Sequence, residues 1–196
     1  MIAVASIVEG DGEVKALPIL LRRMSAWKSP DLPVNPLPPI RVRRDRFLNR
    51  DDEFRKQLLL AAAKCGDQGW ILIVLDADDD CPAELGATIR ERARQVVPHR
   101  RLSVVLANRE FEAWFIASSR SLDGSRGFAL AADEEVDAES HRNAKGWMRQ
   151  HMRETYREVL DQPAFTARFD LQQAFNGSRS FRKLCKEWQL HIEERT

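Results

Sequence analysis

The chain has 196 residues, and its 31 lysines and arginines nearly balance its 30 aspartates and glutamates, which gives a formal net charge of +1. This length favours one domain with room for a helical appendage. Hydrophobic residues make up 43% of the chain, enough for a sizeable core, and this excludes an intrinsically disordered protein. The balanced charge excludes a uniformly basic coat protein and a uniformly acidic tail, but it leaves room for local patches of either sign.

The chain carries no sequence signal for a membrane or for secretion. No apolar run reaches the roughly 18–20 residues that a membrane span requires, and the start lacks the regions of a signal peptide. The cysteines, Cys65, Cys81 and Cys185, have neither the spacing of a disulfide framework nor that of a zinc site. We therefore expect a cytoplasmic protein with free thiols and no membrane partner.

The first part of the chain alternates between strand and helix patterns. Residues 2–8 are apolar and end at a glycine-containing turn, which predicts a strand buried on both faces. Apolar residues then recur at helical spacing over 13–24, so a helix follows. Residues 28–39 contain five prolines and are expected to form a stiff, extended connection rather than a regular element. Residues 40–44 resemble a short edge strand.

The same alternation continues to about residue 117. A helix is expected from Asp51 or Asp52 to Gly66, followed by the clearest buried strand, residues 70–75. A helix that begins at Pro82, a buried strand over 102–107 and a helix over 111–117 come next. Buried, non-alternating strands separated by helices predict an α/β fold, a parallel sheet of about four strands flanked by helices.

The strand patterns stop near residue 120. Residues 124–127 and 133–139 are expected to form exposed loops, residues 141–160 a long basic helix, and residues 178–190 a further helix. The predicted organisation is therefore an α/β domain over residues 1–120 and a helical C-terminal extension over residues 121–196, packed on that domain.

Acidic residues follow three of the predicted strands. Because parallel strands place all their carboxyl ends at one edge of the sheet, we expect these side chains to line one crevice. In an extended segment Asp76 and Asp78 point together, and Asp80 joins them if the extension persists. Of Glu110 and Glu112 only one faces the crevice at helical spacing, and Glu112 is favoured because Trp114 packs nearby. The candidate metal ligands are Glu9, Glu13, Asp76, Asp78, Asp80, Glu110 and Glu112.

Carboxylates crowded in this way repel one another unless they take up protons or a divalent cation neutralises them. An all-oxygen ligand set with no histidine or cysteine nearby suits Mg²⁺ or Mn²⁺ rather than zinc. Each acidic cluster by itself is also compatible with an ordinary turn or with a helix start that favours negative charge. Their occurrence after three strands is what favours a metal site.

Three basic stretches, residues 41–56, 142–157 and 179–187, supply the positive charge that a phosphate-binding surface needs. Contacts between such residues and the nucleic-acid backbone give affinity without sequence readout. Each stretch alone is also typical of a solvated helix face. The candidate phosphate-binding residues are Arg41, Arg43, Arg44, Arg142, Arg149, Arg179 and Lys183.

Three short motifs carry a resemblance to a known family. They are VEGDGE at residues 8–13, LDAD at residues 75–78 and REFEAWF at residues 109–115. Together they resemble the signatures of the DUF4276 family, which looks like the Toprim domains of topoisomerases, primases and OLD-family nucleases. Lys145, Tyr156, Asp161-Gln162 and residues 178–182 also resemble the C-terminal pattern of that family.

The resemblance implies Mg²⁺-dependent (or Mn²⁺-dependent) chemistry on nucleic-acid phosphodiesters. Carried over to this chain, Glu9 is the catalytic glutamate, Asp76 and Asp78 hold metal, and Glu13 joins the metal shell. Glu112, with Glu110, completes the site. The resemblance also implies a role in anti-phage defence or DNA repair with a separate ATPase of the AAA or ABC type, since the chain lacks a phosphate-binding GxxxxGK[ST] loop.

The hypothesis that follows is a metal-dependent nuclease acting on DNA or RNA, in which the cation polarises the scissile phosphate and lowers the pKa of a bound water. Lys145 or Arg182 is the candidate cation for neutralising charge in the transition state. The alternative is a non-catalytic subunit that keeps the fold and binds nucleic acid or the ATPase. A small-molecule phosphohydrolase using Asp76 is a weaker third hypothesis, and the oligomeric state stays open.

Overall fold

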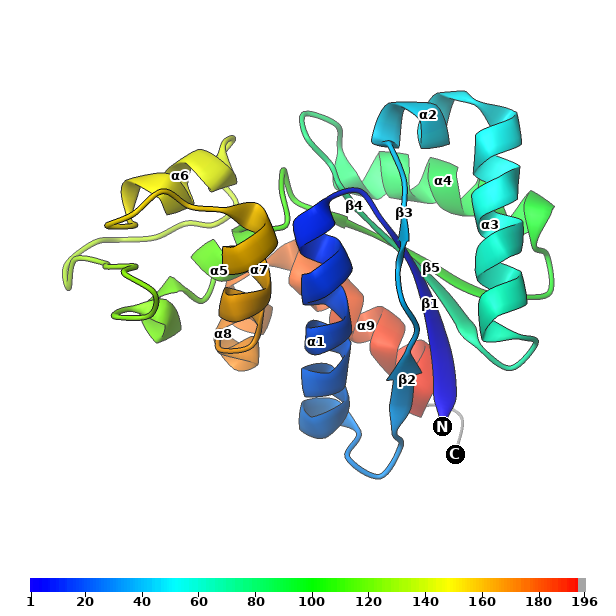
Figure 1. Cartoon of the computed structure of the whole chain (residues 1–196), viewed down its shortest axis with the longest axis horizontal. Helices are drawn as coiled ribbons and strands as arrows, with labels where there is room; N and C mark the ends of the chain where they lie inside the picture. Colours follow the sequence, from blue (N-terminus) through cyan, green and yellow to red (C-terminus); the bar gives the residue numbers. More distant parts are fainter. Residues whose placement is uncertain (194–196) are drawn as a thin grey trace.

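A computed structural model describes residues 1–193, which form a parallel sheet covered by helices on both faces (Figure 1). Neighbouring strands follow the order β2–β1–β4–β5, and β3 pairs with β1 beyond the end of β2. All these pairs are parallel, so the predicted parallel sheet flanked by helices is confirmed. The strands are β1 (Ile2–Val8), β2 (Val34–Pro36), β3 (Ile40–Arg41), β4 (Trp70–Asp76) and β5 (Arg101–Ala107).

The helices of the described chain are short to medium in length, and none of them combines the length and hydrophobicity of a membrane span. They are α1 (Asp11–Lys28), α2 (Arg44–Asn49), α3 (Asp51–Cys65), α4 (Pro82–Val96), α5 (Ala113–Ile116), the 3₁₀ turn η1 (Ser119–Leu122), α6 (Ala144–Gln150), α7 (Glu158–Thr166), α8 (Leu171–Gly177) and α9 (Arg179–Ile192). Helices α1, α3, α4, α5 and α9 lie at predicted positions, whereas α2, η1 and α8 were not predicted.

The uninterrupted hydrophobicity of β4 reflects burial on both faces of the sheet. Leu72 and Val74 point into a core that also receives side chains from α1 and α9, whereas Ile71, Ile73 and Leu75 point into a second core with α3 and α4. Successive side chains of a strand lie on opposite faces, so a strand covered on both sides is apolar along its length, as residues 70–75 are; the acid comes only at its carboxyl end, Asp76. Every residue of β4 is buried.

The proline-rich segment is more regular than expected. Residues 34–36 pair with the start of β1, and Leu37 N–H donates to the carbonyl of Val4 at 2.9 Å. Residues 40–41 then resume pairing with the end of β1. Proline lacks an N–H donor, so it is tolerated on an edge strand whose outer side needs no ladder partner. The prediction of a purely irregular connection over residues 28–39 was therefore wrong for β2.

The long basic helix expected over residues 141–160 was also wrong. The chain instead forms α6 and α7, separated by an irregular segment that lies against the loop of residues 124–129. Arg153 N–H donates to the carbonyl of Gly127 at 2.9 Å, and Ala129 N–H donates to the carbonyl of His151 at 2.8 Å. These long-range hydrogen bonds satisfy backbone groups that would otherwise bond within a continuous helix. The local sequence pattern contains no sign of these bonds.

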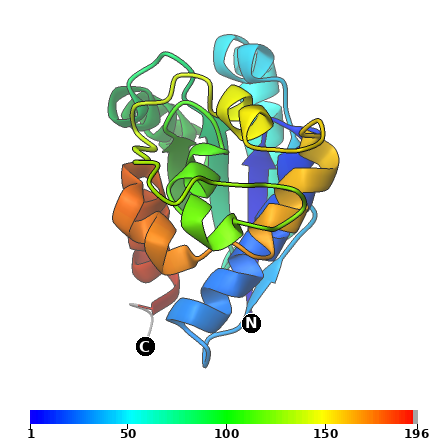
Figure 2. The ribbon, with the colours of Figure 1, turned by 90° about the vertical axis from the view of Figure 1, so that its left-hand side faces the viewer.

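The segment after residue 120 shares the core of the sheet. In Figure 2 the part of the chain from α5 to α8 faces the viewer and lies in front of the sheet. The indole of Trp188, on α9, meets Trp70 of β4 edge to face at 6.1 Å, and its N–H donates to Ser29 Oγ at 3.0 Å. The helical segment after residue 120 therefore contributes to the stability of the α/β part; residues 194–196 lie outside the described chain.

Replacing Trp188 by alanine is expected to lower the free energy of unfolding by about 3–5 kcal/mol, because the change opens a cavity between α9 and the sheet. Urea denaturation followed by circular dichroism measures the change. Leu190→Ala is the matched control, since Leu190 is half exposed on the same helix and should alter stability by less than about 0.5 kcal/mol. Equal effects of the two substitutions would contradict a shared core.

Candidate functional site

The strand order places the acidic residues on neighbouring strands. Glu9 directly follows β1, Asp76 ends β4, and Glu112 follows β5 after a short loop. The chain moves outward from β1 to β2 in one direction and from β1 to β4 and β5 in the other. A ligand site in an open parallel sheet forms at the carboxyl ends of the strands, at such a point of reversal. The crevice beside Glu9 and Asp76 is at this point.

Glu13 both starts α1 and contributes to the acidic crevice. Its Oε2 accepts the N–H groups of Glu9 at 3.0 Å and of Gly10 at 3.1 Å, as a helix-capping glutamate does. Burial raises the pKa of Glu13, while the two backbone donors lower it in part. Burial also raises the pKa of Glu9, and the nearby carboxylates of Glu13 and Asp78 raise it further.

Asp76 links β4 to the loop that follows β5. Its Oδ1 accepts the N–H of Phe111 at 2.8 Å, and its Oδ2 lies 3.6 Å from Lys145 Nζ. Burial holds the pKa of Asp76 well above its ordinary value, and the neighbouring carboxylates of Glu13 and Glu112 act in the same direction. Asp76 therefore orients the third acidic segment, and its ionised form is electrostatically costly in this position.

Glu112 is the most deeply buried carboxyl of the site, with no exposed surface. Its Oε1 accepts the hydroxyl of Tyr156 at 2.8 Å and the amide N–H of Gln162 at 2.7 Å. Burial raises the pKa of Glu112 to about 7, although these two donors oppose the shift. Burial and the charge of Glu112 raise the pKa of Tyr156, so the hydroxyl stays protonated and continues to donate.

Lys145 supplies the positive charge inside the crevice. Its Nζ lies 3.6 Å from Asp76 Oδ2, 3.7 Å from Glu110 Oε1 and 3.8 Å from Glu158 Oε2. Burial alone would lower the pKa of Lys145, but the surrounding carboxylates, led by Glu112, raise it above the ordinary value. The backbone N–H of Lys145 also donates to Glu110 Oε2 at 2.9 Å, which fixes the start of α6 over the crevice.

The acidic run after β4 divides between the crevice and the surface. The extended backbone ends at Asp76, and the chain then turns, with a positive φ of 51° at Asp78. Arg44 binds the outer carboxylates: its guanidinium lies 3.4 Å from Asp78 Oδ2 and 2.6 Å from Asp80 Oδ2. The structure thus leaves Asp78 at the rim beside Glu9, and it turns Asp80 outward to Arg44.

The other predicted phosphate-binding arginines lie on the surface, and two of them are paired with acids. Arg41 contacts Asp11 at 3.0 Å, and Arg142 contacts Asp79 at 3.1 Å. Such exposed pairs contribute little stability. Two more predicted residues are exposed, Arg43 and Arg149.

The basic residues of α9 do not approach the carboxylates. Arg182 uses its guanidinium to bind the carbonyls of Phe175 at 2.9 Å and Asn176 at 2.8 Å, which closes the C-terminal end of α8. Arg179 and Lys183 line a separate cavity beside β5. Lys145, rather than Arg182, is therefore the cationic side chain that the fold brings into the crevice.

Sequence reasoning did not single out Glu158, and it gave Gln162 and Tyr156 no place in the site. Glu158 and Gln162 lie on the first turns of α7, a helix that the sequence analysis had merged with α6. The only signal for Tyr156 and Gln162 was the C-terminal family pattern, and no signal pointed to Glu158. Their part in the site depends on the packing of α7 against the start of α1.

The candidate ligands of the crevice are all carboxylates, and hard divalent cations such as Mg²⁺ prefer such oxygen ligands. Within residues 1–193, no group of three or more acidic, histidine or cysteine side chains is arranged to hold an ion. Among the described atoms, Glu9 Oε2 and Glu112 Oε2 are buried without a hydrogen-bond partner. Such orphan oxygens need a donor or a cation.

A protein-family comparison gives the chain its affiliation. The model described as a domain of unknown function, DUF4276, matches residues 8–188. The chain belongs to the DUF4276 family. The matched range of this DUF4276 member includes every residue of the crevice described above. Searches of curated proteins and of solved structures found no match.

Glu112→Gln is expected to remove part of the pH dependence of stability. The folded-state pKa of about 7 lies above the ordinary value of 4.5, so the folded chain holds the extra proton and loses stability as the pH rises from 4.5 to 7. The glutamine cannot ionise, so the variant should gain up to about 3 kcal/mol relative to the parent across that window. Urea titrations between pH 4.5 and 8 measure this difference, and parallel stability curves for the two proteins would contradict it.

Gly12→Ala is expected to displace α7 from the crevice. A Cβ at this position would lie 2.0 Å from Gln162 Oε1 and 2.9 Å from the carbonyl of Glu158. Overpacking of this kind costs about 1–3 kcal/mol, which thermal unfolding measures. Gly86→Ala is the matched control, because its Cβ would meet only Leu106 Cγ, at 4.0 Å, and alanine favours a helix. A Gly12→Ala protein as stable as the parent would contradict the close approach of α7.

Proposed function

We propose that this DUF4276 protein is a Toprim-like, metal-dependent phosphodiesterase that hydrolyses DNA or RNA. The observation that carries the proposal is a set of carboxylates at the carboxyl ends of adjacent parallel strands: Asp76 and Glu112 are buried, and Glu9 beside them is half-buried. Folding brings these carboxylates together although their removal from water disfavours their charged forms. Carboxylates held in such an unfavourable environment are typical of functional sites. The motifs at residues 8–13 and 75–78, which resemble those of Toprim domains, support the same chemistry.

The residues that would hold Mg²⁺ or Mn²⁺ are Glu9, Asp76 and Asp78, with Glu13 and Glu112 lining the deeper part of the crevice. When bound, the cation supplies a Lewis acid that polarises the phosphate and activates water. We assign proton transfer at the attacking water to Glu9, because its carboxyl is only part-buried and burial raises its pKa above the ordinary value. Lys145 would place its ammonium against the charge that develops on the phosphate.

The rim of the crevice supports an approach by a phosphate backbone. Arg44, Arg109 and Arg142 each pair with an exposed aspartate of the turn after β4. Exchange of these weak pairs for phosphate contacts would hold a nucleic acid without reading its sequence. We place the protein in the cytoplasm, as its cysteine pattern favours. As the resemblance implies, we place its activity in anti-phage defence or DNA repair, with a separate ATPase partner.

A second candidate is a non-catalytic subunit that retains the fold and binds nucleic acid or the ATPase. The observation that favours it is Lys145, whose ammonium already faces Asp76, Glu110 and Glu158. A lysine that permanently neutralises the carboxylates would leave them a structural role. The two candidates differ in whether a divalent cation binds.

The expected activity is cleavage of single-stranded DNA, duplex DNA or RNA in the presence of Mg²⁺ or Mn²⁺. Glu9→Gln and Asp76→Asn should each reduce the rate at least about 100-fold, because each removes a charge from the reacting centre. Asp67→Asn is the control, since Asp67 is an exposed aspartate paired with Arg100 in the loop before β4, at the opposite end of the sheet. Gel assays with the purified chain, alone and with its ATPase partner once identified, measure the rates.

Calorimetry separates the two candidates. The catalytic proposal requires Mn²⁺ or Mg²⁺ to bind at millimolar concentrations or below, with weaker binding to Asp76→Asn and unchanged binding to Asp67→Asn. Cleavage that survives both Glu9→Gln and Asp76→Asn would overturn the site assignment. No cation binding, together with nucleic-acid binding that persists in EDTA, would replace the catalytic proposal by the non-catalytic one.

A further inference from the structure

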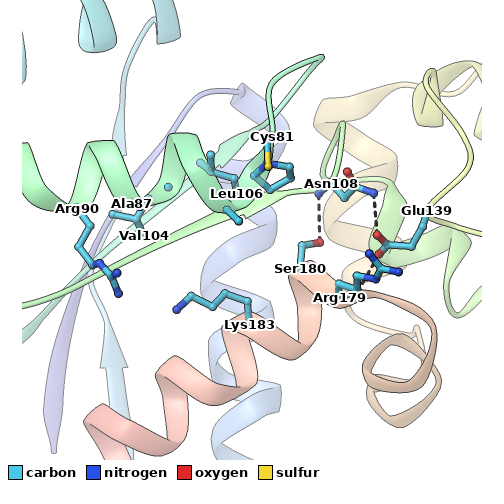
Figure 3. Close-up of a pocket in the computed structure, with 13 residues that line it drawn as sticks. Cys81, Ala87, Arg90, Val104, Leu106, Asn108, Glu139, Arg179, Ser180 and Lys183 are labelled. Atoms are coloured by element: carbon cyan, nitrogen blue, oxygen red, sulfur yellow. Dashed lines mark hydrogen bonds between the residues drawn. The ribbon is translucent and has the colours of Figure 1, made fainter.

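A groove runs along the free edge of the sheet, away from the acidic crevice. β5 pairs with β4 on one side, and no strand of the described chain lies on its other side. Helices α4 and α9 flank this edge without covering it (Figure 3). The space between them is a cavity of about 760 Å³, within the range of roughly 300–1,000 Å³ that is usual for ligand pockets.

The backbone of β5 presents hydrogen-bonding groups to this groove. The carbonyls of Ala107 and Arg109 accept N–H groups from residues 77 and 78, on the side of β4. Backbone groups alternate in direction along an extended strand, so those of Val104 and Leu106 point away from β4. Asn108 N–H, which continues this outward series, donates to Ser180 Oγ of α9 at 3.2 Å. An unpaired strand edge of this kind is a template for another extended chain.

The α4 wall of the groove leaves room for a second backbone. Ala83, Gly86 and Ala87 line it. A Cβ on Gly86 would meet only Leu106 Cγ, at 4.0 Å, so the space above this glycine is open. The floor, formed by Val104 and Leu106, is apolar. Such a surface suits alternate apolar side chains of an added strand, as in other peptide grooves formed by a strand and a helix.

The charges at the groove select for an acidic occupant. Arg90 of α4, Arg179 of α9 and Lys183 of α9 line the groove (Figure 3). Neither arginine forms an ion pair through its guanidinium within residues 1–193, whereas Lys183 pairs with Glu187. The one lining acid, Glu139, is already occupied, since it accepts N–H groups from Asn108 at 2.9 Å and from Arg179 at 2.8 Å. The groove is therefore net positive.

We propose that this groove binds an extended, acidic segment of a partner protein, which adds to the sheet as a strand beside β5. The accessible edge, residues 104–108, accommodates about five residues at roughly 3.3 Å each. A peptide matches both the outward backbone groups and the apolar floor, whereas a nucleic acid would use only the positive charge. The proposal is independent of the phosphodiesterase activity, because no residue of the groove belongs to the acidic crevice.

The test uses fluorescent hexapeptides in which glutamate alternates with Val, Ile, Leu or Phe, and fluorescence polarisation measures their binding to the full chain. Members of this set should bind. Replacing glutamate by lysine, or N-methylating alternate backbone nitrogens, should weaken binding at least about tenfold, because each change removes one of the two recognised features. On binding, the amides of Val104 and Leu106 should become protected from hydrogen exchange.

Two substitutions and one control locate the binding. Gly86→Leu fills the groove and Arg90→Glu reverses its charge, so each should weaken peptide binding, while Arg22→Glu, an exposed change on α1, should not. Circular dichroism and thermal unfolding confirm that the variants fold. The proposal is overturned if no acidic peptide binds, or if binding is the same in Gly86→Leu and Arg90→Glu as in the parent.

Two other occupants have their own signatures. Binding of an oligothymidylate that protects the same amides, in place of the peptides, would assign the groove to nucleic acid and overturn the proposal. A dimer in sedimentation velocity that Gly86→Leu dissociates would assign the groove to a second copy of the chain and overturn it equally. A monomer that binds acidic peptides at Val104 and Leu106 supports it.

Discussion

The site depends on the balance between several buried carboxylates and the ammonium of Lys145. Desolvation raises the pKa of Glu9, Glu13, Asp76 and Glu112, so folding works against their ionisation. Such a cluster persists only where protons or cations offset the repulsion. Lys145 is the cation that this chain itself provides. Because Lys145 lies on α6 and its ammonium lies close to Asp76, α6 is positioned at the carboxyl ends of the strands.

The segment after residue 120 completes the crevice. Asn143 caps α6 by accepting the N–H of Gly146, and Glu110 accepts the N–H of Lys145, so the lysine is held by both the capping residue and the loop after β5. Helix α7 approaches α1 closely at Gly12 and brings the side-chain amide of Gln162 to Glu112. The helical segment therefore closes the core and supplies both the positive charge of Lys145 and the neutral donors that Glu112 accepts.

The near-neutral composition conceals two surfaces of opposite charge. The carboxyl edge of the sheet concentrates acids, whereas the free edge of β5 is flanked by Arg90, Arg179 and Lys183. The two surfaces meet at the end of β5, where Asn108 binds Ser180 of the groove and Arg109 binds Asp79 beside the crevice. An occupant of the groove would lie next to the segment that carries Glu110 and Glu112.

Local patterns predicted the buried strands and the acids that follow them, because burial on two faces and the turn at a strand end leave signals within a few residues. Local patterns failed where contacts with distant parts of the chain determine the secondary structure. Residues 34–36 form a strand because they pair with β1. Residues 141–160 do not form one helix because their middle part is hydrogen-bonded to the loop of residues 124–129.

The sequence by itself determined that this is a parallel α/β protein with acids at three strand ends. Only the tertiary structure decided which acids face the crevice, that Asp80 turns outward to Arg44, and that Lys145, Tyr156 and Gln162 contact the carboxylates. The physical reason is the distance along the chain over which each interaction acts. Hydrophobic periodicity acts within one element, whereas a buried charge is compensated by whichever partner the whole fold brings within a few ångströms.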